Sequence, residues 1–477
     1  MVRSRDVLTR VSQGVVFALA VSAPLGSYAS GFQAFGLSIF LFRLAVLGAL
    51  PLAVATAGRH SKRLARPILG LMLVVAVWWL VGAAGFQWWS LGTETGLKSL
   101  AAVGFGLALL VLVWLLPCEW EQIGDALVTG WQVGFMITSL VAFWEVVFMR
   151  HLPGYLMDTA PAYFLDNRFA MSTLGNPNNY GAYLLYVLAI LLAGAVSTTS
   201  PRARILHYLG VGLTVGLLVM SGARVALLGC VVEVAVLVAV SARRQRGRVA
   251  LLVLLLAGVA YVVVVNWGGY ALAKLGTLVS GFSSQGSLQV RLNLALNGAY
   301  LSFQHFGLGV GPGGFGPSVA SGTVPFNTFG FVDPHSFFTE VGSEYGVFSL
   351  AGFLLWLVGL LRLTVRRVGF DGTTPSAAKR WRLMLLLGLT AYVFAVFENS
   401  TYMSESTNWA FLTTLAVFAC SLKAEAKRTE AKGHRSASRL RVPASSESGL
   451  ESDDTVTRGR QADRFAAGSK VVPMKES

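Results

Sequence analysis

The sequence is poor in charged residues and in cysteine. Only 13% of its 477 residues are charged, against about a quarter in a soluble domain. Hydrophobic residues make up 54%, more than so few charges can shield from water. Three cysteines (Cys118, Cys230 and Cys420) exclude a disulfide framework and give no paired-cysteine metal site. These shortages exclude an ordinary soluble protein and indicate a membrane protein with many crossings.

Long apolar runs are what the sequence does contain. One crossing of a bilayer takes about 20 apolar residues. Segments that approach this length lie at 11–29, 34–57, 67–87, 97–116, 127–149, 180–197, 205–221, 225–241, 249–267, 345–364, 383–398 and 408–422. Because some of them are short, we expect an all-α polytopic membrane protein with 10 to 12 transmembrane helices.

The positions of the basic residues predict the orientation. A net charge of +15 at first suggests that the protein binds nucleic acid, but the Lys and Arg residues form short clusters between apolar runs. With the N-terminus inside, the inner loops and the N-terminus hold 19 basic residues and the outer loops hold six. Cytoplasmic loops carry this excess. We therefore expect both termini in the cytoplasm and no nucleic-acid partner.

The chain divides into a membrane domain and a tail. Residues 1–422 hold all the apolar segments and include a large external loop at 268–335, in which 290–305 has helical spacing. Residues 423–477 are rich in Ser, Arg, Lys and Glu, which predicts a disordered cytoplasmic tail.

Three polar residues fall on the outer side once this topology is set. They are Arg224, Arg291 and His335. Two arginines with paired donors suit a lipid-linked diphosphate, and a histidine that titrates near neutrality can accept a proton from a sugar hydroxyl. Taken alone, each residue has an ordinary explanation. Arg224 can be an arginine at a helix end, and Arg291 a solvated loop charge. His335 can simply lie at a helix start, with Asp333 as the N-cap and Pro334 at the first helical position.

The sequence offers weaker candidates as well. Asp333 and Glu398 are the next candidates for the base if His335 is not one. The stretch from Gly307 to Phe315 predicts a tight turn with close backbone approach, and it follows no strand of a dinucleotide-binding unit. No pair of histidines has metal-ligand spacing with acids, so we expect no metal and no cofactor.

The chain resembles the O-antigen ligase and polymerase family of bacterial membrane glycosyltransferases. The likeness runs from about Arg224 to Leu361, with weaker support from Gly175-Asn176-Pro177-Asn178-Asn179. Three motifs carry the likeness, in this order. Arg291-Leu292 leads a predicted helix, the glycine-rich run Gly309-Val310-Gly311-Pro312-Gly313-Gly314-Phe315 follows, and His335 opens a span that contains Glu344-Tyr345-Gly346-Val347. Ala223, Ala295 and Ser336 depart from the family's usual Ser, Trp and Asn.

The resemblance implies a polyisoprenyl-diphosphate-dependent glycosyltransferase in the cytoplasmic membrane of a bacterium, where it acts on the outer face. It implies an undecaprenyl-diphosphate-linked glycan as donor and a sugar or another envelope molecule as acceptor, with membrane lipids around the protein. His335, Arg224 and Arg291 are then the catalytic residues. Arg224, Arg291, Gly309, Gly311, Gly313 and Asn179 are the substrate-binding residues. Ligase and polymerase both remain open, and a transporter or flippase of lipid-linked glycans or a small solute is the alternative.

Overall fold

The structure is a computed structural model with two compact units, Met1–Thr429 and Glu430–Ser477. It describes residues 2–28, 32–34, 37–57, 65–89, 93–152, 169–240, 287–365, 376–398 and 403–440, and the single residues 247, 250, 253 and 258. The helical body described below belongs to the first unit.

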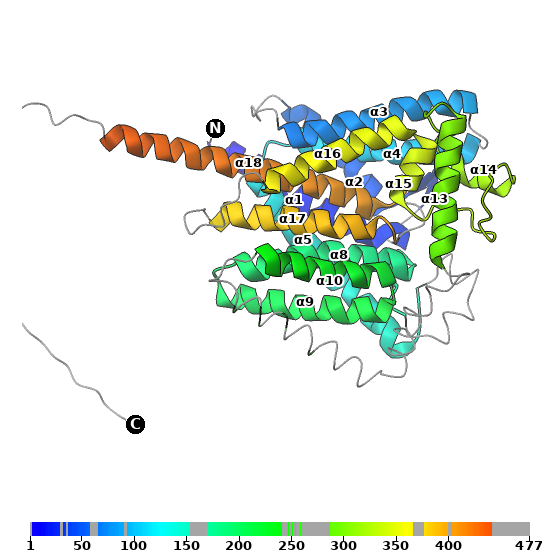
Figure 1. Ribbon diagram of the computed structural model, residues 1–477. Coiled ribbons are helices and arrows are strands. Elements are labelled where there is room, and N and C mark those ends of the chain that lie inside the picture. Colours follow the sequence, from blue (N-terminus) through cyan, green and yellow to red (C-terminus); the bar gives the residue numbers. More distant parts are fainter. Residues whose placement is uncertain are drawn as a thin grey trace, which may run out of the picture. The chain divides into compact units, whose positions relative to one another are not determined.

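Eleven long helices form this body (Figure 1). They are α1 (Val2–Ser22), α2 (Leu41–Thr56), α3 (Arg66–Trp89), α4 (Thr93–Leu115), α5 (Trp120–Phe148), α8 (Pro177–Ser197), α9 (Pro201–Ser221), α10 (Arg224–Val240), α16 (Val347–Val365), α17 (Ser376–Ala395) and α18 (Ser406–Leu440). The other elements of the described part are η1 (Ala23–Tyr28), β1 (Phe32–Ala34), β2 (Leu37–Ile39), η2 (Ser172–Leu174), α13 (Ser287–Gln304), α14 (Phe315–Ala320) and α15 (Phe337–Glu344).

The hydropathy pattern predicted this architecture well. Eleven of the twelve apolar segments coincide with a long helix, and the remaining one, 249–267, lies outside the described residues apart from Ala250, Val253 and Gly258. Eight helices of the described part are long and apolar enough to cross a membrane, namely α1, α3, α4, α5, α8, α9, α16 and α18. The prediction of an all-α integral membrane protein is therefore confirmed.

Two segment boundaries differ from the prediction. The segment at 34–57 begins as a small antiparallel hairpin in which Gln33 pairs with Ser38, and its helix starts only at Leu41. At the other end of the chain, α18 continues beyond residue 422 to Leu440. The first part of the tail that we expected to be disordered is thus helical, and residues 441–477 lie outside the described part.

Local sequence signals set several helix ends. The side chain of Asn176 accepts a hydrogen bond from the backbone N–H of Asn178 at 2.8 Å, and Pro177 follows at the first helical position of α8. Ser200 and Pro201 repeat this arrangement at the start of α9. The same helix ends at Gly222, whose left-handed backbone (φ 66°) turns the chain so that α10 starts two residues later, at Arg224.

Helix α8 lies at the centre of the body. It packs against α17, α9 and α10, and nearly all of its residues are buried. Its Tyr183 and Tyr186 rings contact Trp131 of α5, whose indole Nε1 donates to Thr414 of α18 at 3.0 Å. This aromatic core fixes the long helices side by side, and their ends therefore form two separate polar surfaces.

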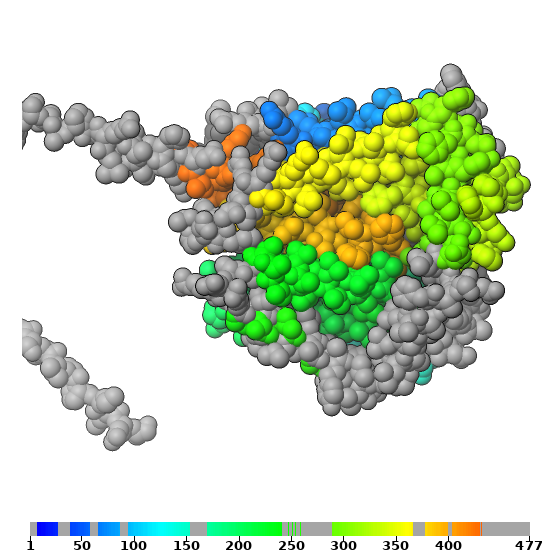
Figure 2. Space-filling view, in the orientation of Figure 1, coloured from blue at the N-terminus to red at the C-terminus, as the bar shows by residue number. Residues whose placement is uncertain are grey.

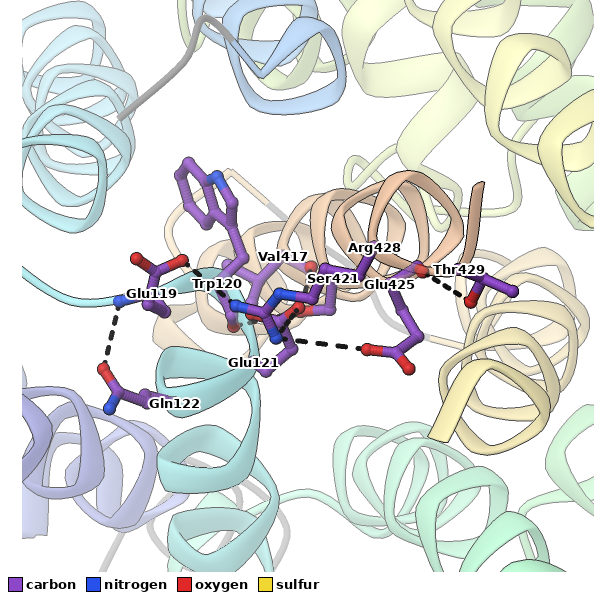
Figure 3. Close-up of polar contacts among 9 residues, drawn as sticks. All are labelled: Glu119, Trp120, Glu121, Gln122, Val417, Ser421, Glu425, Arg428 and Thr429. Carbon is purple, nitrogen blue, oxygen red and sulfur yellow. Dashed lines mark hydrogen bonds and ion pairs between the residues drawn. The ribbon is translucent and has the colours of Figure 1, made fainter. Parts of the chain in front are cut away.

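One of these two ends carries the beginning of α5 and the final turns of α18 before residue 430. Figure 3 shows the Arg428 side chain of α18 between Glu119, Glu121 and Glu425, at 3.5, 3.1 and 4.0 Å. Arg380 forms an ion pair with Asp125 at the same end of α5, at 2.7 Å. Exposed ion pairs of this kind contribute about 0–1 kcal/mol each, so they mark this surface more than they stabilise it.

The opposite end carries the short helices. Figure 1 shows α13 running across the ends of the long helices, with α14 and α15 beside it. The chain reaches α13 after α10 and leaves through α15 into α16. The predicted external loop 268–335 therefore includes, from residue 287 onward, a small helical cap on this end. Its helix at 290–305 is confirmed as α13.

Candidate active site

A turn that follows α17 connects all three predicted catalytic residues. The turn is Val396–Glu398, directly after the last residue of α17. The carbonyl of Val396 accepts a hydrogen bond from the N–H of Phe337 at 3.0 Å, which places the turn beside the start of α15 and near His335. Its next two residues contact Arg291 and the first turn of α10.

Glu398 occupies the middle of this arrangement. Its carboxylate is only 2% exposed, and its Oε1 accepts a hydrogen bond from the N–H of Ala226 at 2.7 Å. The other oxygen, Oε2, lies 4.0 Å from an Nη atom of Arg291. Burial raises the pKa of Glu398 to about 6, although Arg291, the α10 N–H groups and Arg224 act in the opposite direction. The carboxylate therefore caps α10 and holds Arg291, and it titrates near neutrality.

Arg224 is the first residue of α10 and its side chain is exposed. A cation at a helix N-terminus opposes the positive end of the helix dipole, so this position costs stability unless an anion is present. Glu398 supplies one negative charge near it, since the Arg224 charge lowers the pKa of that carboxyl. An exposed guanidinium here is therefore available for an external anion such as a diphosphate.

Arg291 belongs to the second turn of α13. One of its Nη atoms donates to the carbonyl oxygen of Phe397 and another faces Glu398. The side chain remains 26% exposed, so part of its donor set is still open to solvent. Five N–H donors in a planar fork allow one guanidinium to be held by the turn and to bind an anion at the same time.

His335 lies next to Arg291, but not at the start of a helix. We expected Asp333 to cap a helix and Pro334 to open it, and this prediction is wrong. Helix α15 begins at Phe337 with Ser336 as N-cap, and His335 has a left-handed backbone with φ 48°. A non-glycine residue in this region is strained, by about 1–3 kcal/mol, and such strain occurs at functional sites.

The surroundings of His335 favour the neutral ring. Burial lowers its pKa, the positive charge of Arg291 lowers it further, and Asp333 acts in the opposite direction. The ring also makes an edge contact with Phe331, with centroids 5.7 Å apart. A neutral imidazole can accept a proton, so the arrangement of a base beside two arginines has the chemistry required for transfer from a diphosphate.

The glycine-rich loop has a packing role. Gly309, Gly311 and Gly313 all have positive φ, as does Gly346 beyond α15. A Cβ on Gly309 would lie 2.7 Å from the backbone of Glu344, so the loop and the end of α15 approach more closely than any side chain allows. The sequence predicted this close approach, and the structure identifies α15 as the partner.

Several N–H groups of this loop are already used. Those of Val310 and Gly311 donate to the carbonyls of Ser343 and Glu344 at 2.8 and 3.1 Å, and that of Gly313 donates to the Glu344 side chain at 2.8 Å. Burial raises the pKa of this carboxyl to about 7. Because these donors point inward, the predicted binding role of Gly311 and Gly313 requires a substrate to contact the loop in another way, and that of Gly309 stays a prediction.

Asn179 lies in the first turn of α8. Its Nδ2 donates to Glu405 Oε1 at 3.2 Å, and its Oδ1 has no hydrogen-bond partner among the described residues. The structure brings Arg224, Arg291 and His335 together, and it joins Asn179 to a different acidic residue. Within the described part of the chain, no group of three or more His, Cys, Asp or Glu side chains could hold a metal ion.

Comparison with known protein families gives a match over part of the chain. Residues 209–357 match the family described as O-antigen ligase. The matched segment runs from the middle of α9 into α16, so it contains Arg224, Arg291, His335 and the glycine-rich loop. It supports the family that the sequence predicted, and with it a glycosyltransferase-type activity of ligase or polymerase. Comparison with curated proteins gives no match.

The site also depends on residues outside the segment that matches the O-antigen ligase family. Glu398 and the turn before it lie 39 residues or more beyond the last matched residue. Sequence reasoning named Glu398 only as a substitute base, and it missed the role of this residue in joining Arg291 to the start of α10. The available signal was its position: a carboxylate directly after an apolar helix, on the side where the two arginines were expected.

Proposed function

We propose that the protein transfers a glycan from undecaprenyl-diphosphate to an acceptor sugar or envelope molecule on the outer face of the cytoplasmic membrane. The observation that carries this proposal is the turn at 396–398, which holds Arg291 and the start of α10 on one carboxylate and lies beside His335. Two permanent cations at the edge of a membrane domain fit a lipid-linked diphosphate better than they fit a neutral ligand.

The proposed reaction uses each residue at a stated step. His335 accepts the proton of the acceptor hydroxyl while the hydroxyl oxygen forms a bond to the anomeric carbon of the donor glycan. The bond from that carbon to the phosphate oxygen breaks, and the electron pair stays on undecaprenyl diphosphate. Arg224 and Arg291 stabilise this growing negative charge through charge-assisted hydrogen bonds. Glu398 does not touch the substrate in this scheme and acts as a positioning residue for Arg291.

The outer location of the site rests on charge. The end of the body that carries Arg380 and Arg428 also joins the basic clusters that the sequence predicts to be cytoplasmic. Single cysteines at Ser321, after α14, and at Thr199, between α8 and α9, report the two ends. We expect a membrane-impermeant maleimide to label Ser321→Cys in intact cells and Thr199→Cys only after permeabilisation. The reverse pattern would place the site in the cytoplasm.

Transfer by the purified protein tests the reaction itself. The protein is reconstituted into vesicles with a radiolabelled glycan on undecaprenyl diphosphate, and candidate acceptors are added one at a time. We expect glycan on the acceptor and free undecaprenyl diphosphate in equal amounts. Movement of intact donor across the vesicle membrane, with its sugar–phosphate bond unbroken, would instead support a flippase.

A further inference from the structure

The outward face of α13 is apolar. Residues at helical spacing i, i+3, i+4, i+7, i+11 and i+14 are all exposed, namely Leu292, Ala295, Leu296, Ala299, Phe303 and Phe306. Phe303 is 73% exposed and Phe306, just past the helix end, is 88% exposed. None of these six residues is polar. In a helix that lies in water, the exposed face carries polar residues, so this pattern requires an apolar partner.

The asparagines of α13 lie on its buried face, and its exposed polar residues, Gln289 and Gln304, lie near its two ends. Asn293 donates to the carbonyl of Asn327 at 2.6 Å and Asn297 donates to that of Phe326 at 2.8 Å, which fixes the loop after α14 to the helix. A Cβ on Gly298 would lie 2.7 Å from the Thr339 side chain, because α15 packs directly against this side. The protein therefore covers the face that contains asparagine and leaves the face of Leu, Ala and Phe uncovered.

The exposed face of α13 continues into the surface of a membrane-spanning helix. Phe306 precedes Gly307, and a Cβ on Gly307 would lie 3.3 Å from the ring of Phe348 in the first turn of α16. Phe348 and Leu355 are both exposed on α16, which is one of the eight candidate spans. Figure 2 shows α13 and α16 side by side on one surface, and Figure 1 shows α13 running across the span rather than along it.

We propose that α13 lies in the interface of the bilayer, with its apolar face among the lipid acyl chains just below the headgroups. The axis of α13 runs across the spans at one of their ends, and its apolar outward face continues into the exposed apolar face of α16. This is the geometry of an interfacial helix. The basic residues usual on the polar side of such helices are not needed here, because protein covers that side.

This position has a consequence for the donor, which rests on the function proposed above. Arg291 lies on the edge of α13, between the covered face and the apolar face. An interfacial helix would hold its guanidinium at the level of the headgroup phosphates. The diphosphate of a membrane-anchored donor would then reach Arg291 by lateral diffusion, with its polyisoprenyl chain still in the acyl region.

Fluorescence quenching from the lipid tests the position of the helix without measuring transfer. Single cysteines at Leu296 and Phe303, in the full chain with Cys118, Cys230 and Cys420 replaced, carry a bimane probe in vesicles of phosphatidylcholine brominated on its acyl chains. Leu355→Cys on α16 is the lipid-facing control, and Ser321→Cys is the water-facing control. We expect quenching at Leu296 and Phe303 of at least half that at Leu355, with blue-shifted emission.

Three results would overturn the proposal, and each has its own meaning. Quenching equal to that at Ser321 would place the face of α13 in water. Blue-shifted emission without quenching by lipid would mean that another part of the chain covers it. A disulfide between Leu296→Cys residues of two molecules in the bilayer would identify a second copy as the partner. Loss of transfer activity would not bear on any of these readings, so failure of the proposed function stays distinguishable.

Discussion

Replacing Arg291 by Lys keeps the charge and removes the forked donor set. In the protein, one Nη atom is engaged by the Phe397 carbonyl and another lies 4.0 Å from Glu398. A lysine has a single ammonium group, so it can either stay on the turn or reach a diphosphate. A hydrogen bond to a charged group contributes about 1.5–3 kcal/mol, which corresponds to roughly 10- to 150-fold in rate. We expect kcat/KM for transfer to fall by that factor.

The assay is transfer by purified protein in vesicles at saturating acceptor, with donor binding measured separately. Arg380→Lys is the matched control, because Arg380 also combines an ion pair, with Asp125 at 2.7 Å, and an aromatic contact, with Trp381. It lies at the opposite end of the body, so its change should leave transfer within about twofold. If Arg291→Lys also stays within twofold, Arg291 does not bind the diphosphate through paired donors, and the reasoning from the turn is refuted.

Other residues of the site give further predictions. His335→Ala should keep donor binding and lose about 10²–10⁴-fold in turnover, the usual contribution of a general base; nearly full turnover by His335→Gln would show that the residue only positions the acceptor. Transfer should decline as pH falls through about 6, where Glu398 takes up a proton and loses its hold on Arg291. Glu398→Gln should be less active at pH 7.5 and should lose the part of the decline near pH 6 that protonation of Glu398 causes; an unchanged pH profile would contradict this. Gly309→Ala (φ 83°) should lower the free energy of unfolding by about 1–3 kcal/mol, which a lower melting temperature in detergent would report. Gly359→Ala, with open space around its Cβ position, should leave the melting temperature unchanged.

Hydropathy predicted the spans because whether a segment can cross the bilayer depends mainly on its own length and apolar composition. An apolar run of about 20 residues satisfies the bilayer whatever its neighbours are, so α3, α8 and α16 were located to within a few residues. The hairpin before α2 was missed for the same reason. Its residues are apolar enough for a span, and their pairing with each other means that α2 begins only at Leu41.

The candidate residues came from the sequence, and their geometry did not. Arg224, Arg291 and His335 were selected because charged and titratable groups are rare in this sequence and fell on one side of the predicted topology; their catalytic roles stay a prediction. The neighbouring Glu398 contacts were not predicted, because the link between α10 and the 396–398 turn joins residues 172 positions apart in the chain. The conformation of His335 was mispredicted because Asp-Pro is a common helix start, whereas the helix begins three residues later, at Phe337, whose N–H donates to Val396.

The turn at 396–398 also determines when the candidate site is completed during synthesis. Arg224 and Arg291 leave the ribosome before this turn exists, and the partner that holds Arg291 is made only after α17. A nascent chain that has made its helices only through α16 therefore lacks the carboxylate that caps α10. The arrangement of Arg291 and the start of α10 on one carboxylate is thus among the last parts of this body to be assembled.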